Sequence, residues 1–200
     1  MSEVDCCAGS SRAYVDESFR TVERRSGFYL VAAVALEVEA EEAARRMLRK
    51  ALPGRMERFH WRSDSDSQHE RVIGAIAEMD GLSMTVFVQE GVDERRQERY
   101  RQHALWNVVV ELGGQCHHSL IFEARERSQD RIDTKTLSNI TRSRAGGPKF
   151  NYTFGRPLDE PLLWLPDALL GATGLMLTGR TDRWWRRLPN KPELIHLDPP

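Results

Sequence analysis

Three acidic residues stand beside apolar segments that lie far apart in the chain. Asp16 follows the apolar run of a short strand, Glu123 ends a second apolar run, and Asp167 is the single acid of a late apolar segment. A carboxylate among apolar residues is costly unless it meets a cation or a hydrogen-bond network. We therefore expect the fold to gather these three acids into one site.

Converging carboxylates suit a divalent metal ion. Mg²⁺ (or Mn²⁺) prefers oxygen ligands, so a site made only of acids is chemically suitable. In phosphodiester cleavage by two such ions, one activates a water and the other stabilises the leaving oxygen. The pattern predicts a metal-dependent nuclease with Asp16, Glu123 and Asp167 as metal ligands and catalytic residues. Glu17 is a lesser candidate, because successive side chains on a strand point to opposite faces.

Neighbouring residues each have a functional and a structural interpretation. His60 could act as a general base or contact phosphate, or it could be a connector histidine packed beside Trp61. Asp130 and Asp133 could supply a further metal ligand, or they could lie on the solvated face of a helix. Nucleic-acid contacts are expected in the basic stretch that follows Glu123, from Arg127, Arg131, Arg142 and Arg144. Arginine suits such contacts because its guanidinium binds phosphate through two donors.

Two adjacent tryptophans, Trp184 and Trp185, stand among arginines near the C-terminus. Aromatic side chains beside cationic ones could stack on single-stranded bases. The same pair could instead clamp the C-terminal tail or form an oligomer contact, and we favour this second interpretation. A homo-oligomer is compatible with the sequence.

The composition describes an ordinary soluble chain of 200 residues, with 40% hydrophobic and 30% charged residues. The net charge of -1 gives no overall basic field that would indicate nucleic acid. No apolar run approaches the roughly 20 residues that span a bilayer. Three cysteines make a disulfide framework improbable. We expect a cytoplasmic protein that does not interact with membranes.

Hydrophobic periodicity predicts one α/β domain with a mixed sheet. A hairpin comes first, followed by alternating helices and strands and a closing helix. We expect a flexible tail over 1–11, the domain over 12–179 and an Arg/Trp-rich and Pro-rich extension over 180–200. The polar stretch 19–27 is predicted to be the hairpin loop. Strands are expected at 12–18, 28–38, 82–89, 116–123, 149–154 and 193–197, and helices at 39–52, about 66–79, 93–112, 127–143 and 162–177.

The chain resembles the domain of unknown function 3800 family, whose members are ribonuclease H-like. The matching segments are Tyr14-Val15-Asp16-Glu17-Ser18, Phe59-His60-Trp61, Ile121-Phe122-Glu123 and Leu163-Trp164-Leu165-Pro166-Asp167-Ala168-Leu169-Leu170-Gly171-Ala172. The resemblance implies a ribonuclease H-like mixed sheet with acids on the first strand, the fourth strand and the last helix. Those places correspond to Asp16, Glu123 and Asp167.

A second hypothesis is a catalytically degenerate ribonuclease H-like module that binds nucleic acid or a protein partner. The nearly neutral net charge favours it. So does Arg58, which stands two places before His60, because family members often carry an acid before that histidine. An arginine close to the carboxylates would weaken the binding of metal ions.

Overall fold

The computed structural model describes residues 11–23, 26–54, 56–114, 119–143 and 150–200. The tail expected over 1–11 therefore lies outside the described residues, apart from Ser11. Among the described residues, every helix is too short or too polar to cross a lipid bilayer.

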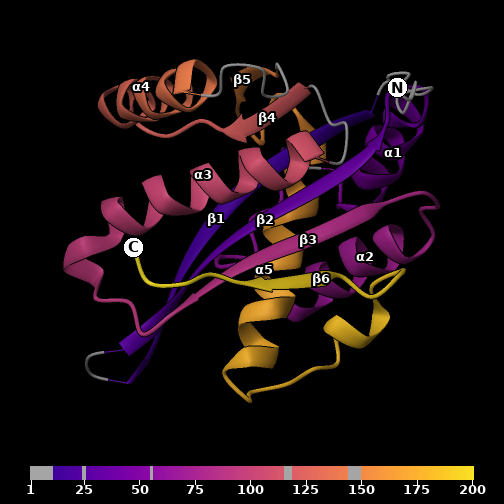
Figure 1. The fold of residues 1–200 in the computed structure, drawn as a ribbon. Coiled ribbons are helices and arrows are strands. Elements are labelled where there is room, and N and C mark those ends of the chain that lie inside the picture. The colour runs from indigo at the N-terminus through magenta and orange to yellow at the C-terminus, as the bar shows by residue number, and fades with distance from the viewer. Residues whose placement is uncertain (1–10, 24–25, 55, 115–118, 144–149) are drawn as a thin grey trace, which may run out of the picture.

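A mixed sheet of six strands forms the centre of the molecule, in the spatial order β5-β4-β1-β2-β3-β6 (Figure 1). The long strands β1, β2 and β3 pair in antiparallel fashion, whereas β4 runs parallel to β1 and β5 parallel to β4. The short β6 runs parallel to β3 and forms the other edge. The bounds are β1 Ser11–Glu23, β2 Ser26–Glu37, β3 Ser83–Glu90, β4 Ser119–Glu123, β5 Asn151–Gly155 and β6 Glu193–His196.

Helices cover both faces of this sheet (Figure 1). One apolar core joins the sheet to α1, α2 and α5, and a second core joins the opposite face to α3 and α4. Their bounds are α1 Val38–Ala51, α2 Asp66–Ala77, α3 Gln97–Gly114, α4 Arg127–Ser143 and α5 Trp164–Leu177. The expected mixed α/β sheet and its closing helix are confirmed.

The predicted loop over 19–27 is wrong in extent, because β1 continues to Glu23 and β2 starts at Ser26. Phe19 pairs with Tyr29 and Arg20 with Phe28 in the same antiparallel ladder. Polar residues do not end a strand when one of its faces is solvated, since alternate side chains point away from the core. The longer hairpin carries Arg20 onto the strand rather than into a turn.

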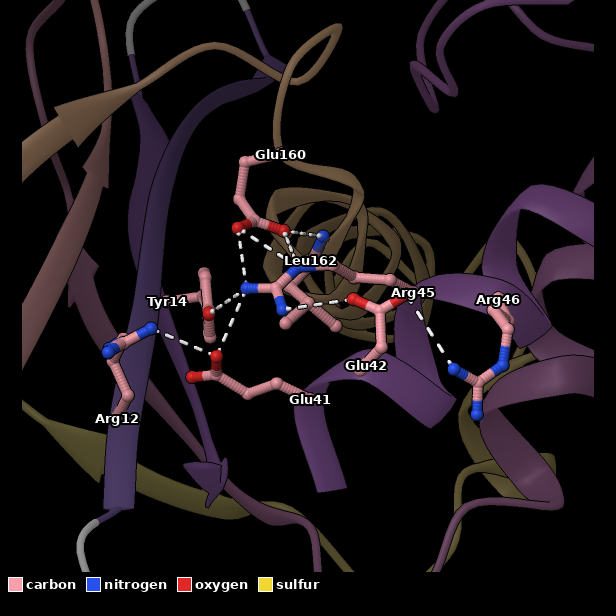
Figure 2. Close-up of polar contacts among 8 residues, drawn as sticks. All are labelled: Arg12, Tyr14, Glu41, Glu42, Arg45, Arg46, Glu160 and Leu162. Atoms are coloured by element: carbon pink, nitrogen blue, oxygen red, sulfur yellow. Dashed lines mark hydrogen bonds and ion pairs between the residues drawn. The ribbon is translucent and has the colours of Figure 1, made fainter. Parts of the chain in front are cut away.

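An ion network ties α1 to β1 and to the segment before α5 (Figure 2). Arg45 donates to Glu160 at 2.8 Å and to Glu41 at 3.1 Å, and Arg12 donates to Glu41 at 2.9 Å. Glu160 also accepts a hydrogen bond of 3.0 Å from the backbone N–H of Leu162, in the short helix η2 (Pro161–Leu163) that leads into α5. The network thus fixes the position at which α5 begins.

The C-terminal segment packs against α2. Trp184 is only 2% exposed, and its ring lies edge-on to Trp61 and His69. Ion pairs join Arg183 to Asp66, and Arg187 to Glu70. Because it is buried, the Trp184 ring is not free to stack on a nucleic-acid base. Its contacts agree instead with a clamp that holds the C-terminal segment.

Candidate active site

The alternation of side chains along β1 and β4 places two of the predicted acids on one face of the sheet. Tyr14 belongs to the core that contains α5, so Asp16, two residues on, faces the same side. Ile121 packs against that core as well, which directs Glu123 to it. Because Val15 pairs with Phe122 in the parallel ladder, the next residues Asp16 and Glu123 come level with each other.

The third acid, Asp167, reaches this face from the first turn of α5, which packs against β1 and β2. Its Oδ2 atom accepts a hydrogen bond of 2.8 Å from the backbone N–H of Trp61. A carboxylate in the first turn of a helix also benefits from the positive end of the helix dipole. Both α5 and the connector before α2 therefore fix the position of Asp167.

Trp61 is itself held by close packing. Its indole ring stacks on the His69 ring, with centroids 3.9 Å apart and planes 7° from parallel. The indole also meets Gly171 of α5 so closely that a Cβ atom there would fall 2.0 Å from the ring. His69 Nε2 lies 2.9 Å from the Trp61 carbonyl oxygen. These contacts fix the peptide whose N–H binds Asp167.

Neighbouring carboxyl groups shift the pKa values of Asp16 and Glu123. Burial raises the pKa of Asp16 well above its ordinary value, and the charges of Glu123 and Asp167 raise it further, whereas Arg101 lowers it. A hydrogen bond between Asp16 and Glu123 raises the pKa of Asp16 and lowers that of Glu123.

Burial also raises the pKa values of Glu123 and Asp167. The charge of Asp167 raises the pKa of Glu123 further, while His60 and Arg58 lower it. For Asp167, the Trp61 N–H, His60 and Arg20 oppose the effect of burial on the pKa. The structure therefore brings Asp16, Glu123, Asp167 and His60 close enough to interact electrostatically.

The donor set fits a hard divalent cation, because several carboxylates that repel one another would be neutralised by it. Within the described ranges, however, no three His, Cys, Asp or Glu side chains are already arranged to hold a metal ion. Burial raises the pKa values of Asp16 and Glu123, so a cation would compete with protons for these carboxyls. The groups needed to bind a metal are therefore present.

These residues line a cavity of about 650 Å³ that opens beside β1, β4 and α5. His60 lies on its wall, and the His60 Nδ1 atom accepts a hydrogen bond of 3.1 Å from the backbone N–H of Arg62. Arginines are the main basic component of the lining: Arg20, Arg58, Arg62, Arg101, Arg125 and Arg180. The cavity thus presents carboxyl and guanidinium groups to one space.

Glu17 points away from Asp16 into an ion network beneath α3 and α4. It pairs with Arg101, accepts a hydrogen bond from Tyr29, and lies 3.5 Å from Nε of Arg125. Arg101 in turn donates to both oxygens of Asp133, at 2.8 and 2.7 Å. Glu17 thus lines the same cavity as the other three acids, but its carboxylate is engaged by this ion network.

The solvated-surface interpretation of Asp133 is wrong, since its side chain is fully buried and is paired with Arg101. A charged residue can be buried in this way when a bidentate arginine compensates it. Asp130 instead accepts a hydrogen bond of 2.9 Å from the backbone N–H of Arg125, at the start of α4. Both aspartates thus have structural partners here.

The arginines expected to bind nucleic acid lie elsewhere. Arg127, Arg131 and Arg142 are exposed on α4 and do not line the cavity, and Arg144 lies outside the described residues. The cavity arginines come from β1, the connector before α2, the start of α3, the β4–α4 connection and the turn after α5. These segments are distant in sequence, so no local charge cluster marks them.

Comparisons with solved structures agree with this topology. The chain is similar to ribonuclease HII of Archaeoglobus fulgidus, solved in complex with PCNA, with a TM-score of 0.54 and 15% identity over 84% of this chain and 75% of that one. Two structures of Bst-RNase HIII, one of a mutant protein and one of a complex with Mn²⁺, each give a TM-score of 0.46, with 12% and 11% identity. The matches cover 84% and 86% of this chain, but only 53% and 55% of those chains.

The fold is ribonuclease H-like. No protein-family model matches the sequence, and none of the curated proteins matches it either. The ribonuclease H-like sheet expected from the resemblance is confirmed. Membership of the domain of unknown function 3800 family stays a prediction.

Proposed function

We propose that this protein is a divalent-metal-dependent nuclease of the domain of unknown function 3800 family. The observation that carries the proposal is the meeting of Asp16, Glu123 and Asp167 in one cavity. Burial raises the pKa of all three, and repulsion from the neighbouring carboxylates raises those of Asp16 and Glu123 further. Perturbed carboxyls that converge in a cleft are typical of functional sites. The ribonuclease H-like fold supports nucleic acid as the substrate.

Asp16, Glu123 and Asp167 would hold Mg²⁺ or Mn²⁺. When bound, such ions lower the pKa of water and stabilise the charge on the leaving oxygen. The chain's own contribution is positional: β1 and β4 bring Asp16 and Glu123 level, and Trp61 holds Asp167. His60 lies on the cavity wall, where its imidazole would contact a phosphate or move a proton. The exposed α4 residues Arg127, Arg131 and Arg142 would contact the nucleic-acid backbone outside the cavity.

A cleavage assay tests the proposal. Purified protein is incubated with labelled single-stranded RNA, double-stranded DNA and an RNA–DNA hybrid, with Mg²⁺, with Mn²⁺ and with EDTA. We expect cleavage of at least one substrate with metal, none with EDTA, and a loss of roughly 100-fold or more in Asp16→Asn, Glu123→Gln and Asp167→Asn. Asp198→Asn, which changes an exposed acid near the C-terminus, is the matched control.

The alternative, a binding module without catalysis, is favoured by one observation. Arg58 lies on the cavity wall and lowers the pKa of Glu123, so its positive charge competes with a cation at that carboxylate. Under this alternative, wild type binds nucleic acid or a protein partner but cleaves none of the three substrates. Arg58→Glu would then be the informative variant, because it replaces the competing cation with an additional acid.

A further inference from the structure

Four arginines on the cavity wall lack an acidic partner among the described residues. Arg58 is one of them and acts on Glu123, and the other three are Arg20, Arg62 and Arg180. Arg20, Arg62 and Arg180 form no ion pair and no side-chain hydrogen bond with any residue that the structure describes, and the Nε atom of Arg20 is buried without an acceptor. Two other arginines of the same wall differ, because Arg101 and Arg125 pair with Glu17 and Asp133. A guanidinium nitrogen buried without a partner is costly, which indicates that a ligand completes the group.

Arg62 and Arg180 each lie close enough to Arg20 to interact with it electrostatically. Burial lowers the pKa of Arg20, and repulsion from Arg62 and Arg180 lowers it further, whereas attraction to Asp167 raises it. Like charges are therefore gathered on one side of the cavity, with an acid near them that does not pair with them directly. An anion between these cations would remove the repulsion.

The fold makes room for this cluster. Arg20 extends from β1 across α5 at Gly174, where a Cβ atom would lie 3.0 Å from Arg20 Nε and 3.3 Å from its Cγ. A larger residue at 174 would push the arginine stem out of this position. Arg62 and Arg180 are exposed, so a solute in the cavity can reach them.

We propose that Arg20, Arg62 and Arg180 form a subsite for a backbone phosphate of nucleic acid, beside Asp16, Glu123 and Asp167. The choice of nucleic acid as the ligand rests on the proposed function. Guanidinium groups bind phosphate through paired N–H donors. Carboxylates repel the phosphate anion and bind cations instead. The cavity therefore divides into an anion-binding part and a cation-binding part, which are the two parts that a phosphodiester with its metal ions requires.

The test measures binding without catalysis. Fluorescence anisotropy follows binding of labelled single-stranded RNA, double-stranded DNA and an RNA–DNA hybrid in EDTA, from about 50 to 300 mM salt. The variant is Arg62→Gln with Arg180→Gln, because both side chains are exposed and their loss leaves the fold intact. The control is Arg49→Gln with Arg71→Gln, which removes the same charge from exposed positions outside the cavity. A thermal melt confirms that both variants fold as wild type does.

We expect wild type and control to bind at least one probe equally, and the Arg62/Arg180 variant to bind about tenfold more weakly at low salt. Each lost phosphate contact should reduce the slope of log affinity against log salt by about 0.7–0.9. An unchanged slope and affinity in the variant, an equal loss in the control, or no binding of any probe by wild type would overturn the subsite.

The outcome is separable from that of the cleavage assay. Binding that depends on Arg62 and Arg180 without any cleavage leaves the subsite standing and contradicts the nuclease function. Cleavage that depends on Asp16, with binding unaffected by loss of Arg62 and Arg180, supports the nuclease function and removes the subsite.

Discussion

The backbone N–H of Trp61 donates a 2.8 Å hydrogen bond to Oδ2 of Asp167. This bond joins the connector before α2 to the first turn of α5, across 106 residues of sequence. It engages one oxygen of Asp167, so the other oxygen is the one with which a cation would interact. This one contact thereby fixes the connector that carries His60 against the helix that carries Asp167.

Gly171→Ala tests the packing behind this contact. A methyl group at 171 would overlap the Trp61 indole, because its carbon would lie 2.0 Å from the ring and both residues are buried. We expect a loss of about 3 kcal/mol in the free energy of unfolding, measured by urea titration, since overpacking a core typically costs about 1–3 kcal/mol. Cleavage activity should fall as well, because the displaced Trp61 no longer holds Asp167.

The matched control is Gly54→Ala, where an added Cβ would meet nothing within 4 Å. Its unfolding free energy should stay within about 0.5 kcal/mol of wild type. Equal stability of Gly171→Ala and Gly54→Ala would show that Trp61 moves without cost, and the proposed positioning role would fail.

Asp16→Asn should separate stability from activity. The amide removes a carboxyl whose ionisation is opposed by burial and by Glu123 and Asp167, yet it keeps a donor for Glu123. Without metal at about pH 8, we expect the melting temperature to rise by about 2–4 °C, as a gain near 1 kcal/mol gives in a protein of this size. A substitution that raises stability while it removes function is typical of an active-site residue.

The control for this prediction is Asp198→Asn, which should leave the melting temperature unchanged because Asp198 is exposed. A lower melting temperature for Asp16→Asn than for wild type would mean that the ionised Asp16 carboxylate stabilises the protein. That result is incompatible with the repulsion described for the cavity.

Stability without metal should depend on pH in a defined direction. The pKa values of Asp16, Glu123 and Asp167 are raised in the folded state. The contribution of these protonated groups is therefore complete below their ordinary pKa values near 4, and it is lost as the pH rises through the raised values. A bound cation requires ionised carboxylates, so its effect has the opposite sign.

We therefore expect millimolar Mg²⁺ to raise the melting temperature more at about pH 8 than at about pH 5.5. Calorimetric titration at the two pH values should show weaker binding and greater proton release at the lower one. The Asp16→Asn variant should lose most of this difference. An Mg²⁺ effect that is independent of pH would place the ion away from these carboxyls.

Arg101→Met tests the ion network on the other face of the sheet. The substitution leaves Asp133 buried without its bidentate partner and removes the cation paired with Glu17. Breaking a buried pair by removing one member typically costs about 3–5 kcal/mol, and we expect a loss of that size in chemical unfolding. The control is Arg131→Met on the exposed surface of α4, which should change the unfolding free energy by less than about 0.5 kcal/mol.

Sequence patterns predicted most of the elements but not the partners of charged residues. Asp16 and Glu123 were recognisable because each follows or ends an apolar run in a strand, and the alternation of β1 then separates Glu17 from Asp16. The pairing of Asp133 with Arg101 had no sequence signal, because it joins different helices across 32 residues. A polar helical surface and a buried ion pair contain the same residue types, so only the tertiary packing distinguishes one from the other.

The cavity arginines show the same limit. The polar residues around Arg20 suggested a turn, whereas the long hairpin extends β1 through it. Arg62 and Arg180 are distant in sequence, so their approach to Arg20 depends on how the connector and the end of α5 fold. The basic residues that were visible in the sequence, Arg127, Arg131 and Arg142, lie on the exposed side of α4 instead.

The central claim is that Asp16, Glu123 and Asp167 together hold a divalent cation. The most direct measurement is anomalous diffraction at the manganese edge from crystals of the wild-type protein grown in Mn²⁺ near pH 8. The account predicts an anomalous peak within coordination distance of carboxylate oxygens of all three residues, and its loss in crystals of Asp16→Asn. The absence of a peak at this position in wild type, or a peak that persists unchanged in Asp16→Asn, would contradict it.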